Sequence, residues 1–348
     1  MRWILYEVPP KETLSMSTPK LTDVARLAGV SPATVSRAIN QPAIVNAETL
    51  ERIQQAIQQI GYETNTAGRN LRLRKSDALL VMISDAPSRF FSQILMGVEA
   101  EASEAGYNVL VSNTQDNPER GRRLYASIQQ SLADGILTFG GHNQELGDLI
   151  RNHPIPIVGV NEHLEDLPVP VTTVNNLDAS RAIVRHLLEL GHRKIGHVTG
   201  TTTLSSGRDR LEGFLSELQQ AGLAPTWICN KHYNVESGRE AAEEWLHLTD
   251  RPTAVFCSCD ETAFGFIAAL QRKGIRVPAD VSVVGFDDIP LADHYCPALT
   301  TIRQPQRELG VTAVRMLLER IHDVEADIPN QRLSGELIVR ESTGPPAN

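Results

Sequence analysis

The sequence predicts an α/β protein, in which a small all-α head precedes a two-lobed body of parallel sheets with helices on both faces. Three observations predict this class. Residues 18–63 carry apolar side chains at helical spacing between capping residues. From residue 78 onward, short β-branched runs alternate with amphipathic stretches, as parallel strands joined by crossover helices do. The body, residues 77–343, is too long for one comfortable open sheet, which predicts two lobes.

The first two helices of the head are expected on either side of a tight turn. Asp23 suits the first turn of a helix that ends before Gly29, because the helix dipole favours a negative charge there, and Gly29 provides the turn. Ser31 is a good N-cap for a second helix over about 32–39. Pro32 suits its first position, where no backbone N–H is needed.

A third helix is expected after Asn46, which is a suitable N-cap, and Gly61 ends it. Its apolar positions recur at helical spacing. They are Leu50, Ile53, Ile57 and Ile60.

The body is expected to cross between its lobes near 174 and again near 303, with a ligand cleft between the lobes at the carboxyl ends of the strands. The expected strands are 78–84, 107–113, 135–140, 156–160, 194–200, 254–259, 281–286 and 336–342. The clearest expected helices are 90–106, 179–191 and 208–222.

Charge is divided unevenly along the chain. The net charge is −9, yet residues 18–75 hold eight basic and four acidic side chains, a net of +4, and residues 76–348 carry −13. A small basic head on a large acidic body indicates a polyanionic partner for the head alone.

The composition excludes several classes of protein. Apolar runs such as ALLVMI at 78–83 are far shorter than the roughly 20 residues of a membrane span, so no membrane partner is expected. The amino terminus has no secretory pattern, and four cysteines in 348 residues make no disulfide framework, so we expect a cytoplasmic protein. Residues 1–17 are expected to be a disordered extension, with Met16 as a candidate start of translation.

The first two helices of the head have the pattern of a helix-turn-helix, whose second helix enters the major groove of DNA at its amino end. Arg37 has the bidentate fork that suits a guanine edge, whereas Pro32 and Ala33 offer only apolar contact. The hydroxyls that can reach phosphates belong to Ser31, Thr34 and Ser36. The alternative is a plain helical hairpin with an exposed arginine.

The string DVARLAGVSPATVSRAIN at 23–40 closely resembles the DNA-binding head of the LacI/GalR (lactose-repressor) family. The likeness covers nearly everything except residues 1–17. Further matching pieces are GY at 61–62, GRNLR at 68–72, GHRKIGHVTG at 191–200, AVFCSCDETAFG at 254–265, VPADVSVVGFDD at 277–288 and PALTTIRQP at 297–305.

The resemblance implies a pattern of DNA contacts. It makes Pro32, Ala33 and Arg37 base-reading positions and Thr34, Ser36 and Asn40 phosphate contacts. Many members carry polar or aromatic side chains at the first two positions, so Arg37 is expected to do more of the reading here.

The segment NTAGRNLR, 65–72, resembles the family's hinge helix, which orders on DNA and inserts a leucine into the minor groove. Arg69 and Leu71 are the DNA-binding positions that it supplies. The alternative for Leu71 is an ordinary exposed linker leucine.

The resemblance also makes the body periplasmic-binding-protein-like, with two lobes that close on a small effector. Arg210 in SSGRD and Asp287 in VVGFDD match an effector-binding arginine and its acidic partner, and such a pair clamps sugar hydroxyls. The alternative is a structural salt bridge between Arg210 and Asp287. Both are expected at strand ends, which favours ligand contact.

Other effector positions follow from the same likeness. Phe90, Phe91 and Tyr233 match aromatic positions that stack on a ring, although aromatics at the start of a helix more often belong to the core. Further matching positions are Asn161, Ser206 and Cys259, whereas Asp260 is expected to cap a helix.

The expected effector is a sugar or sugar derivative first, a nucleoside second and another small molecule third. The pocket positions resemble the cytidine-responsive branch slightly more than the purine-responsive one, in which an aspartate replaces Asn175.

The resemblance and the patterns together give the expected domains and partners. The divisions are an extension 1–17, a helix-turn-helix domain 18–63, a hinge 64–76, an effector-binding and dimerisation domain 77–343 and a tail 344–348. Lobe 1 is expected to span 77–173 and 303–328, and lobe 2 to span 174–302 and 329–343. The expected partners are double-stranded operator DNA, a small-molecule effector and a second copy of the chain in a homodimer, because two heads one helical turn apart raise affinity together.

Enzymatic and metal-dependent functions are not expected. The chain shows no G-x-S-x-G elbow, no P-loop and no G-x-G-x-x-G after the first strand of the body, so no cofactor is expected. Cys257 and Cys259, at C-x-C spacing, are expected to be buried small hydrophobic residues and not ligands of a metal ion. The other classes considered are a solute-binding protein for uptake, which the basic head argues against, and a sugar-modifying enzyme.

Overall fold

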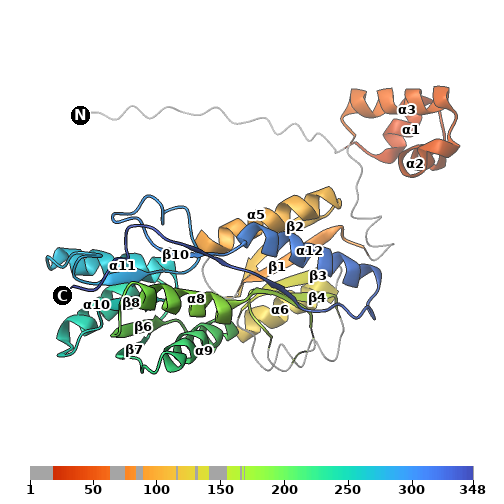
Figure 1. Ribbon diagram of the computed structural model, residues 1–348. Coiled ribbons are helices and arrows are strands. Elements are labelled where there is room, and N and C mark those ends of the chain that lie inside the picture. Colours follow the sequence, from red (N-terminus) through yellow and green to blue (C-terminus); the bar gives the residue numbers. More distant parts are fainter. Residues whose placement is uncertain are drawn as a thin grey trace, which may run out of the picture. The chain divides into compact units, whose positions relative to one another are not determined.

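The computed structural model describes residues 19–62, 75–83, 89–114, 117–129, 132–140, 155–164, 167 and 169–347. The chain divides into two compact units, Met1–Leu73 and Arg74–Asn348, which are described separately as the head and the body (Figure 1). The expected extension 1–17 and the hinge positions Arg69 and Leu71 lie outside the described residues.

The head is helical, and the helix-turn-helix prediction is confirmed. Its helices are α1 (Leu21–Ala28), α2 (Pro32–Asn40) and α3 (Ala47–Ile60), with a 3₁₀ turn, η1, at Pro42–Ile44. The core between the three α-helices is small and apolar, and it holds Val24, Ala25, Ala28, Val35, Ala38, Ile53 and Ala56.

Local chemistry sets the boundaries of these helices. Gly29 ends α1 at φ 66° and Gly61 ends α3 at φ 62°, backbone conformations that favour glycine. The Ser31 hydroxyl accepts the Thr34 N–H at 3.1 Å and so caps α2. Asn46 caps α3 in the same way, as expected.

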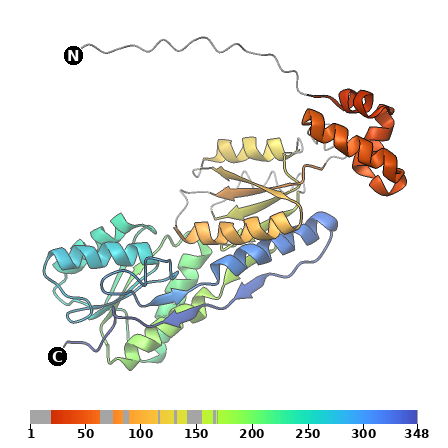
Figure 2. The same ribbon diagram turned by 90° about the horizontal axis from the view of Figure 1, so that it is seen from above.

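The first lobe of the body is built on a six-stranded parallel sheet with the order β11-β5-β4-β3-β1-β2. Helices α5 (Arg89–Glu104) and α12 (Gln306–His322) lie side by side on one face, and α6 (Pro118–Gln129) covers the other (Figure 2). The strands are β1 (Ala78–Ile83), β2 (Asn108–Asn113), β3 (Gly135–Phe139), β4 (Ile157–Val160), β5 (Val171–Val174) and β11 (Gln331–Leu333).

The second lobe is built on a four-stranded parallel sheet with the order β7-β6-β8-β9. Helices α10 (Val235–His247) and α11 (Asp260–Arg272) pack on one face, and α8 (Asn176–Glu189) and α9 (Ser205–Gln220) pack on the other. The strands are β6 (Ile195–Thr199), β7 (Trp227–Asn230), β8 (Ala254–Cys257) and β9 (Ser282–Val284). Two lobes of parallel sheet with helices on both faces confirm the predicted fold class.

The chain passes between the lobes three times. The first passage lies between β5 and α8, and the second lies between β10 (Thr301–Arg303) and α12. The third lies between β11 and β12 (Glu336–Ile338), and β12 pairs antiparallel with β10. The expected assignment of all of 329–343 to the second lobe is wrong for β11, because this strand hydrogen-bonds to β5 in the sheet of the first lobe.

Two glycines let α5 and α12 approach closely. A Cβ atom at Gly97 would lie 2.1 Å from the carbonyl oxygen of Arg307, and one at Gly310 would lie 2.2 Å from that of Ile94. Since a side chain at either position would meet backbone, this close packing requires glycine at both.

Candidate functional site

The orientation of α2 is set by its two buried residues, Val35 and Ala38, which pack into the core of the head. Thr34 and Ser36 are half-buried. The predicted DNA-contacting residues that are exposed are Ser31, Pro32, Ala33 and Arg37. They lie at the amino end of the helix and one turn further, so the helix presents this end to solvent. Asn40 ends the helix, and its side chain is not described.

The polar groups of this face are partly engaged in local bonds. The Ser31 hydroxyl lies 2.8 Å from Thr34 Oγ1 in addition to capping the helix. Arg37 donates Nε to the Ala33 carbonyl at 3.3 Å, a weak contact that an exposed guanidinium exchanges readily. By contrast, Arg26 on α1 forms an ion pair with Asp23 at 2.7 Å.

The body contains a cavity of about 150 Å³ between its two lobes. Its described lining residues are Phe90, Asn161, Glu162, Leu204, Ser206, Arg210, Tyr233, Cys259, Glu261, Asp287 and Ile289. Seven of the eight effector positions expected from the sequence are among them, and Phe91 is the exception. The structure thus brings those residues together, while their contact with an effector stays a prediction.

Phe90 and Phe91 have different surroundings although they are neighbours. The ring of Phe91 is buried in the core of the first lobe and meets Phe139 edge to face, with ring centroids 4.7 Å apart. The expectation that Phe91 faces the effector is therefore wrong, and its alternative, a core aromatic, is correct. Phe90 is partly buried and packs against the cores of both lobes.

Arg210 lies within α9 and not at a strand end, as the sequence suggested, because SSGRD forms the first turns of that helix. Its side chain is buried, with 3% exposed. Nε donates to Asn176 Oδ1 at 2.9 Å and Nη1 donates to the Ser258 carbonyl. The guanidinium also stacks on Phe286, 3.8 Å from the ring centroid, so its position is determined within the second lobe.

Asp287 occupies a strained backbone position, with φ 124°. Its Oδ1 accepts from Gln304 Nε2 at 2.6 Å, and its carbonyl accepts from Gln306 Nε2 at 2.6 Å. Burial raises its pKa to about 7, and the charge of Arg210 opposes this rise. No hydrogen bond or ion pair joins the side chains of Arg210 and Asp287 among the contacts of the described residues, so the alternative, a structural salt bridge between them, is not observed. Contact of both residues with an effector stays a prediction.

Two polar atoms of cavity-lining residues are buried without a hydrogen-bond partner in the described part of the chain. They are Asn161 Oδ1 and Tyr233 Oη. Asn161 directly follows β4 and has a positive φ of 69°. Burial raises the pKa of Tyr233 to about 12, so its hydroxyl keeps its proton at neutral pH. A ligand in the cavity can satisfy such atoms.

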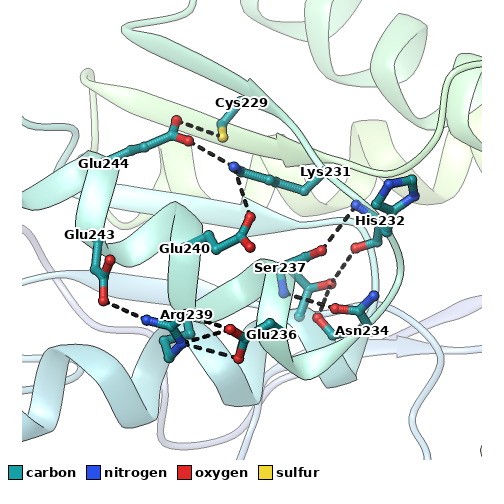
Figure 3. Close-up of polar contacts among 11 residues, drawn as sticks. Cys229, Lys231, His232, Asn234, Glu236, Ser237, Arg239, Glu240, Glu243 and Glu244 are labelled. Carbon is teal, nitrogen blue, oxygen red and sulfur yellow. Dashed lines mark hydrogen bonds and ion pairs between the residues drawn. The ribbon is translucent and has the colours of Figure 1, made fainter.

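Tyr233 belongs to the loop between β7 and α10. Figure 3 shows polar contacts of the residues on either side of it, among them Lys231 and Asn234. Lys231 donates to Glu244 at 2.8 Å and to Glu240 at 3.1 Å. Asn234 caps α10 by accepting the N–H of Ser237 at 2.8 Å, which fixes the other end of the loop. The tyrosine ring also lies against two residues without side chains, Gly200 and Gly207.

Cys259 is the N-cap of α11, a role expected for Asp260. Its Sγ accepts the Thr262 N–H at 3.4 Å, and burial raises its pKa to about 12. Asp260 is instead fully buried below the helix end, where its carboxyl group accepts from the Ile289 N–H at 2.9 Å and from Thr301 Oγ1 at 2.6 Å.

Four of the described lining residues were not expected from the sequence, namely Glu162, Leu204, Glu261 and Ile289, and Glu162 is the most strongly hydrogen-bonded of them. Its side chain is buried and accepts hydrogen bonds from Asn161, Ser205 and Ser206. A signal was available, because Glu162 follows Asn161 at the carboxyl end of the strand PIVGV, the edge at which ligands bind in parallel sheets.

The described residues offer no candidate for a metal site or for a membrane span. They contain no group of three or more His, Cys, Asp or Glu side chains placed to hold a metal ion. Nor is any helix among them long and apolar enough to cross a membrane.

Comparison with family models gives two matches. The model described as bacterial regulatory proteins, lacI family, matches residues 20–65. The model described as periplasmic binding protein-like domain matches residues 184–343.

Relatives match along nearly the whole chain. The HTH-type transcriptional repressor CytR of Escherichia coli is 34% identical over 327 residues, which cover 93% of this chain and 96% of the relative. The HTH-type transcriptional repressor PurR of Photobacterium profundum is 33% identical over 326 residues, covering 92% of this chain and 98% of the relative.

Solved structures show the same extent of likeness. The lac repressor dimer bound to operator and the anti-inducer ONPF is 29% identical with a TM-score of 0.87, and the match covers 94% of this chain and 100% of that one. The complex of the transcriptional regulator CelR with cellobiose is 29% identical with a TM-score of 0.73, covering 93% of this chain and 99% of that one.

Proposed function

The chain belongs to the lacI family of bacterial regulatory proteins, and on that premise we propose that it binds a pseudo-palindromic operator as a dimer under the control of a small molecule in the body. It is a DNA-binding transcriptional repressor with a periplasmic-binding-protein-like effector domain, and it is not an enzyme. A regulator of this kind acts where operator DNA lies, in the cytoplasm.

The exposed amino end of α2 is the observation that carries the proposal. Arg37 is the one exposed guanidinium on this helix, and it reads a guanine edge through two hydrogen bonds. Pro32 and Ala33 contact apolar groups such as a thymine methyl, and Thr34 and Ser36 contact phosphates. Leu71 and Arg69, which lie outside the described residues, stay predicted minor-groove and backbone contacts.

An apolar surface on the first lobe supports the proposed dimer. Strand β2 is the edge strand of its sheet and exposes Leu110 and Val111, and α5 exposes Met96. Exposed apolar side chains on a sheet edge favour contact with a second copy. A relative of known structure, the lac repressor, is described as a dimer bound to operator.

The size and polarity of the cavity favour a sugar as effector, ahead of the larger nucleoside. A cavity of about 150 Å³ accommodates one small ring. The guanidinium of Arg210 uses Nε and Nη1 for protein contacts, which leaves Nη2 for a ligand hydroxyl, and Phe90 offers an aromatic face. The regulator CelR is described in complex with cellobiose, a sugar, which agrees with this class.

Effector control follows from differential binding to two states of the body. An effector that binds one arrangement of the lobes more tightly shifts the equilibrium toward it and so changes the spacing of the two heads. The heads then fit or miss two half-sites one helical turn apart.

Electrophoretic retardation of DNA from the promoter region of the protein's own gene tests the proposal. We expect a fragment with a palindromic site to be bound more tightly than random DNA of equal length, and a sugar or nucleoside to change this affinity. Equal affinity for both DNAs, with and without every candidate ligand, would contradict it.

A further inference from the structure

The carboxylate of Glu162 spans the cleft between the two lobes. Glu162 belongs to the first lobe, but most of its hydrogen-bond donors lie in the first turn of α9 in the second. Oε2 accepts from Ser205 Oγ at 2.7 Å and from the Ser206 backbone N–H at 3.0 Å. Oε1 accepts from the Ser206 hydroxyl and from Asn161 Nδ2, the latter at 3.1 Å.

No side chain at the N-cap position of helix α9 caps its free N–H groups. The N-cap residue is Leu204, whose side chain makes no capping hydrogen bond. A helix N-terminus has free N–H groups and partial positive charge, and it binds phosphate or carboxylate groups. Here Glu162, with 5% exposed, already fills that position, so an anionic group of a ligand would have to displace a buried carboxylate.

The charges of the cavity wall act in the same direction. Among the described lining residues Glu162 and Glu261 carry carboxylates, Asp287 has a pKa raised to about 7 and is partly ionised at neutral pH, and Arg210 carries a guanidinium. Charge repulsion is stronger in a cavity than in water, because the effective dielectric constant is lower. An anionic ligand would therefore be disfavoured beyond its need to displace Glu162.

The hydrogen bond between Asn161 and Glu162 determines which kind of polar group a ligand must present to Asn161. Because Asn161 donates Nδ2 to Glu162, its amide orientation is set and Oδ1 is left buried without a partner in the described part of the chain. An amide oxygen accepts hydrogen bonds only, so a hydroxyl or an N–H satisfies it. A carboxylate oxygen has no proton to donate at neutral pH, and a phosphate monoester has lost most of its second proton there.

We propose that Glu162 is a specificity-determining residue of the effector cavity: it restricts the effector to uncharged molecules that carry hydroxyl or N–H donors and excludes those with a phosphate or carboxylate group. This inference rests on the proposed effector function of the cavity.

The test removes the carboxylate and offers inorganic phosphate as the probe. The variants are Glu162→Ala and a matched control, Glu261→Gln, which also removes one negative charge from the cavity wall. The control carboxylate accepts no hydrogen bond from the first turn of α9 among the described residues. Thermal unfolding is followed against phosphate concentration at constant ionic strength, with Glu162→Gln as a second variant in case the alanine variant does not fold.

Phosphate should raise the melting temperature of Glu162→Ala in a saturable manner and leave the wild type and Glu261→Gln unchanged. Without phosphate, amide exchange at Ser206 should quicken about tenfold in Glu162→Ala, as the loss of a charge-assisted hydrogen bond predicts. Saturable phosphate binding by the wild type, no gain of it in Glu162→Ala, an equal gain in Glu261→Gln, or unchanged exchange at Ser206 would each overturn the proposal.

A ligand panel extends the test to the effector. Cytidine and D-ribose are compared with cytidine 5′-monophosphate and D-ribose 5-phosphate on the wild type, and a phosphorylated compound that binds more tightly than its neutral partner would overturn the proposal. Operator retardation without ligand is measured separately. Its failure would count against the repressor function and not against the role of Glu162.

Discussion

Arg210 stacks on the ring of Phe286, with 3.8 Å between the guanidinium carbon and the ring centroid. The same side chain donates from Nε to Asn176 and from Nη1 to the Ser258 carbonyl, so two of its nitrogen atoms are engaged in the second lobe before any ligand arrives. We therefore expect two roles for Arg210, one in the stability of the lobe and one in effector binding.

Replacing Arg210 should affect both roles. Arg210→Ala leaves the Asn176 and Ser258 acceptors buried and unpaired, which we expect to lower the free energy of unfolding by about 1–3 kcal/mol. Effector response should be lost while operator binding below the melting temperature is kept. Urea unfolding and operator retardation with effector measure the two effects. If the variant is as stable as the wild type, these contacts in the second lobe contribute little to the free energy of unfolding.

Arg37→Ala should weaken operator binding by about 1–3 kcal/mol and relax specificity at one base pair. Arg26→Ala is the matched control, because it removes a positive charge from α1, where the guanidinium is paired with Asp23. Titration of labelled operator and of a single-base variant measures both. Equal losses for the two variants would show that charge, and not base reading, explains the role of Arg37.

Ser31→Ala should destabilise the head by about 1 kcal/mol, because α2 loses its N-cap. Ser31→Asn restores an acceptor at that position and should recover most of the loss. Hydrogen exchange of the α2 amides in the full chain reports the effect, with the amides of the body as an internal reference. Unchanged exchange in Ser31→Ala would mean that the core of the head alone holds α2.

Gly200→Ala should disrupt the cavity without altering its charge. A Cβ atom there would lie 1.9 Å from Cζ of Tyr233, so the ring must leave its position. We expect effector response to be lost and operator binding to be kept. Gly121→Ala on α6 is the control, because its Cβ would meet nothing within 4 Å. A Gly200→Ala variant with normal effector affinity would show that Tyr233 does not contact the ligand.

The stability of the body should depend on pH through Asp287. Burial raises its pKa from 3.8 to about 7, so between these values the folded protein holds a proton that the unfolded chain has lost. This contribution is complete below pH 3.8 and is lost as pH rises through about 7, at a slope of up to about 1.4 kcal/mol per pH unit.

Asp287→Asn, which has no proton to lose, isolates that contribution. The free energy of unfolding of the variant minus that of the wild type should increase from about pH 4 to about pH 7 and then level off. Urea unfolding at several pH values gives this difference, in which other titrating groups such as His197 cancel. A difference independent of pH would show that the pKa of Asp287 is not raised.

Local signals in the sequence explain what could be predicted of the fold. Capping depends on neighbouring residues in the sequence, so the roles of Ser31, Gly29 and Gly61 at their helix ends can be predicted without the rest of the structure. Long buried runs such as 78–83 also stand out. The strands at 171–174, 227–230 and 331–333 were missed, because they are short and their hydrogen bonds come from residues distant in the sequence.

The candidate site was predictable in its position and less so in its contacts. Strand ends and the family resemblance placed seven effector positions on one cavity. Which of Phe90 and Phe91 faces the core depends on how α5 packs on the sheet. Arg210 and Asp287 form no pair among the described contacts, and each instead hydrogen-bonds to another residue, Arg210 to Asn176 and Asp287 to Gln304. The cross-lobe role of Glu162 required two segments 43 residues apart to meet, which no local pattern encodes.

The three passages of the chain between the lobes limit how the body can move. Three covalent connections resist sliding of one lobe along the other, because sliding would stretch at least one of them, whereas a swing that opens or closes the cleft stretches none. Opening and closing of the cleft is therefore the motion that we expect these connections to permit most easily. We expect chemically different ligands in the cavity to act on this same motion and to differ in its direction and extent.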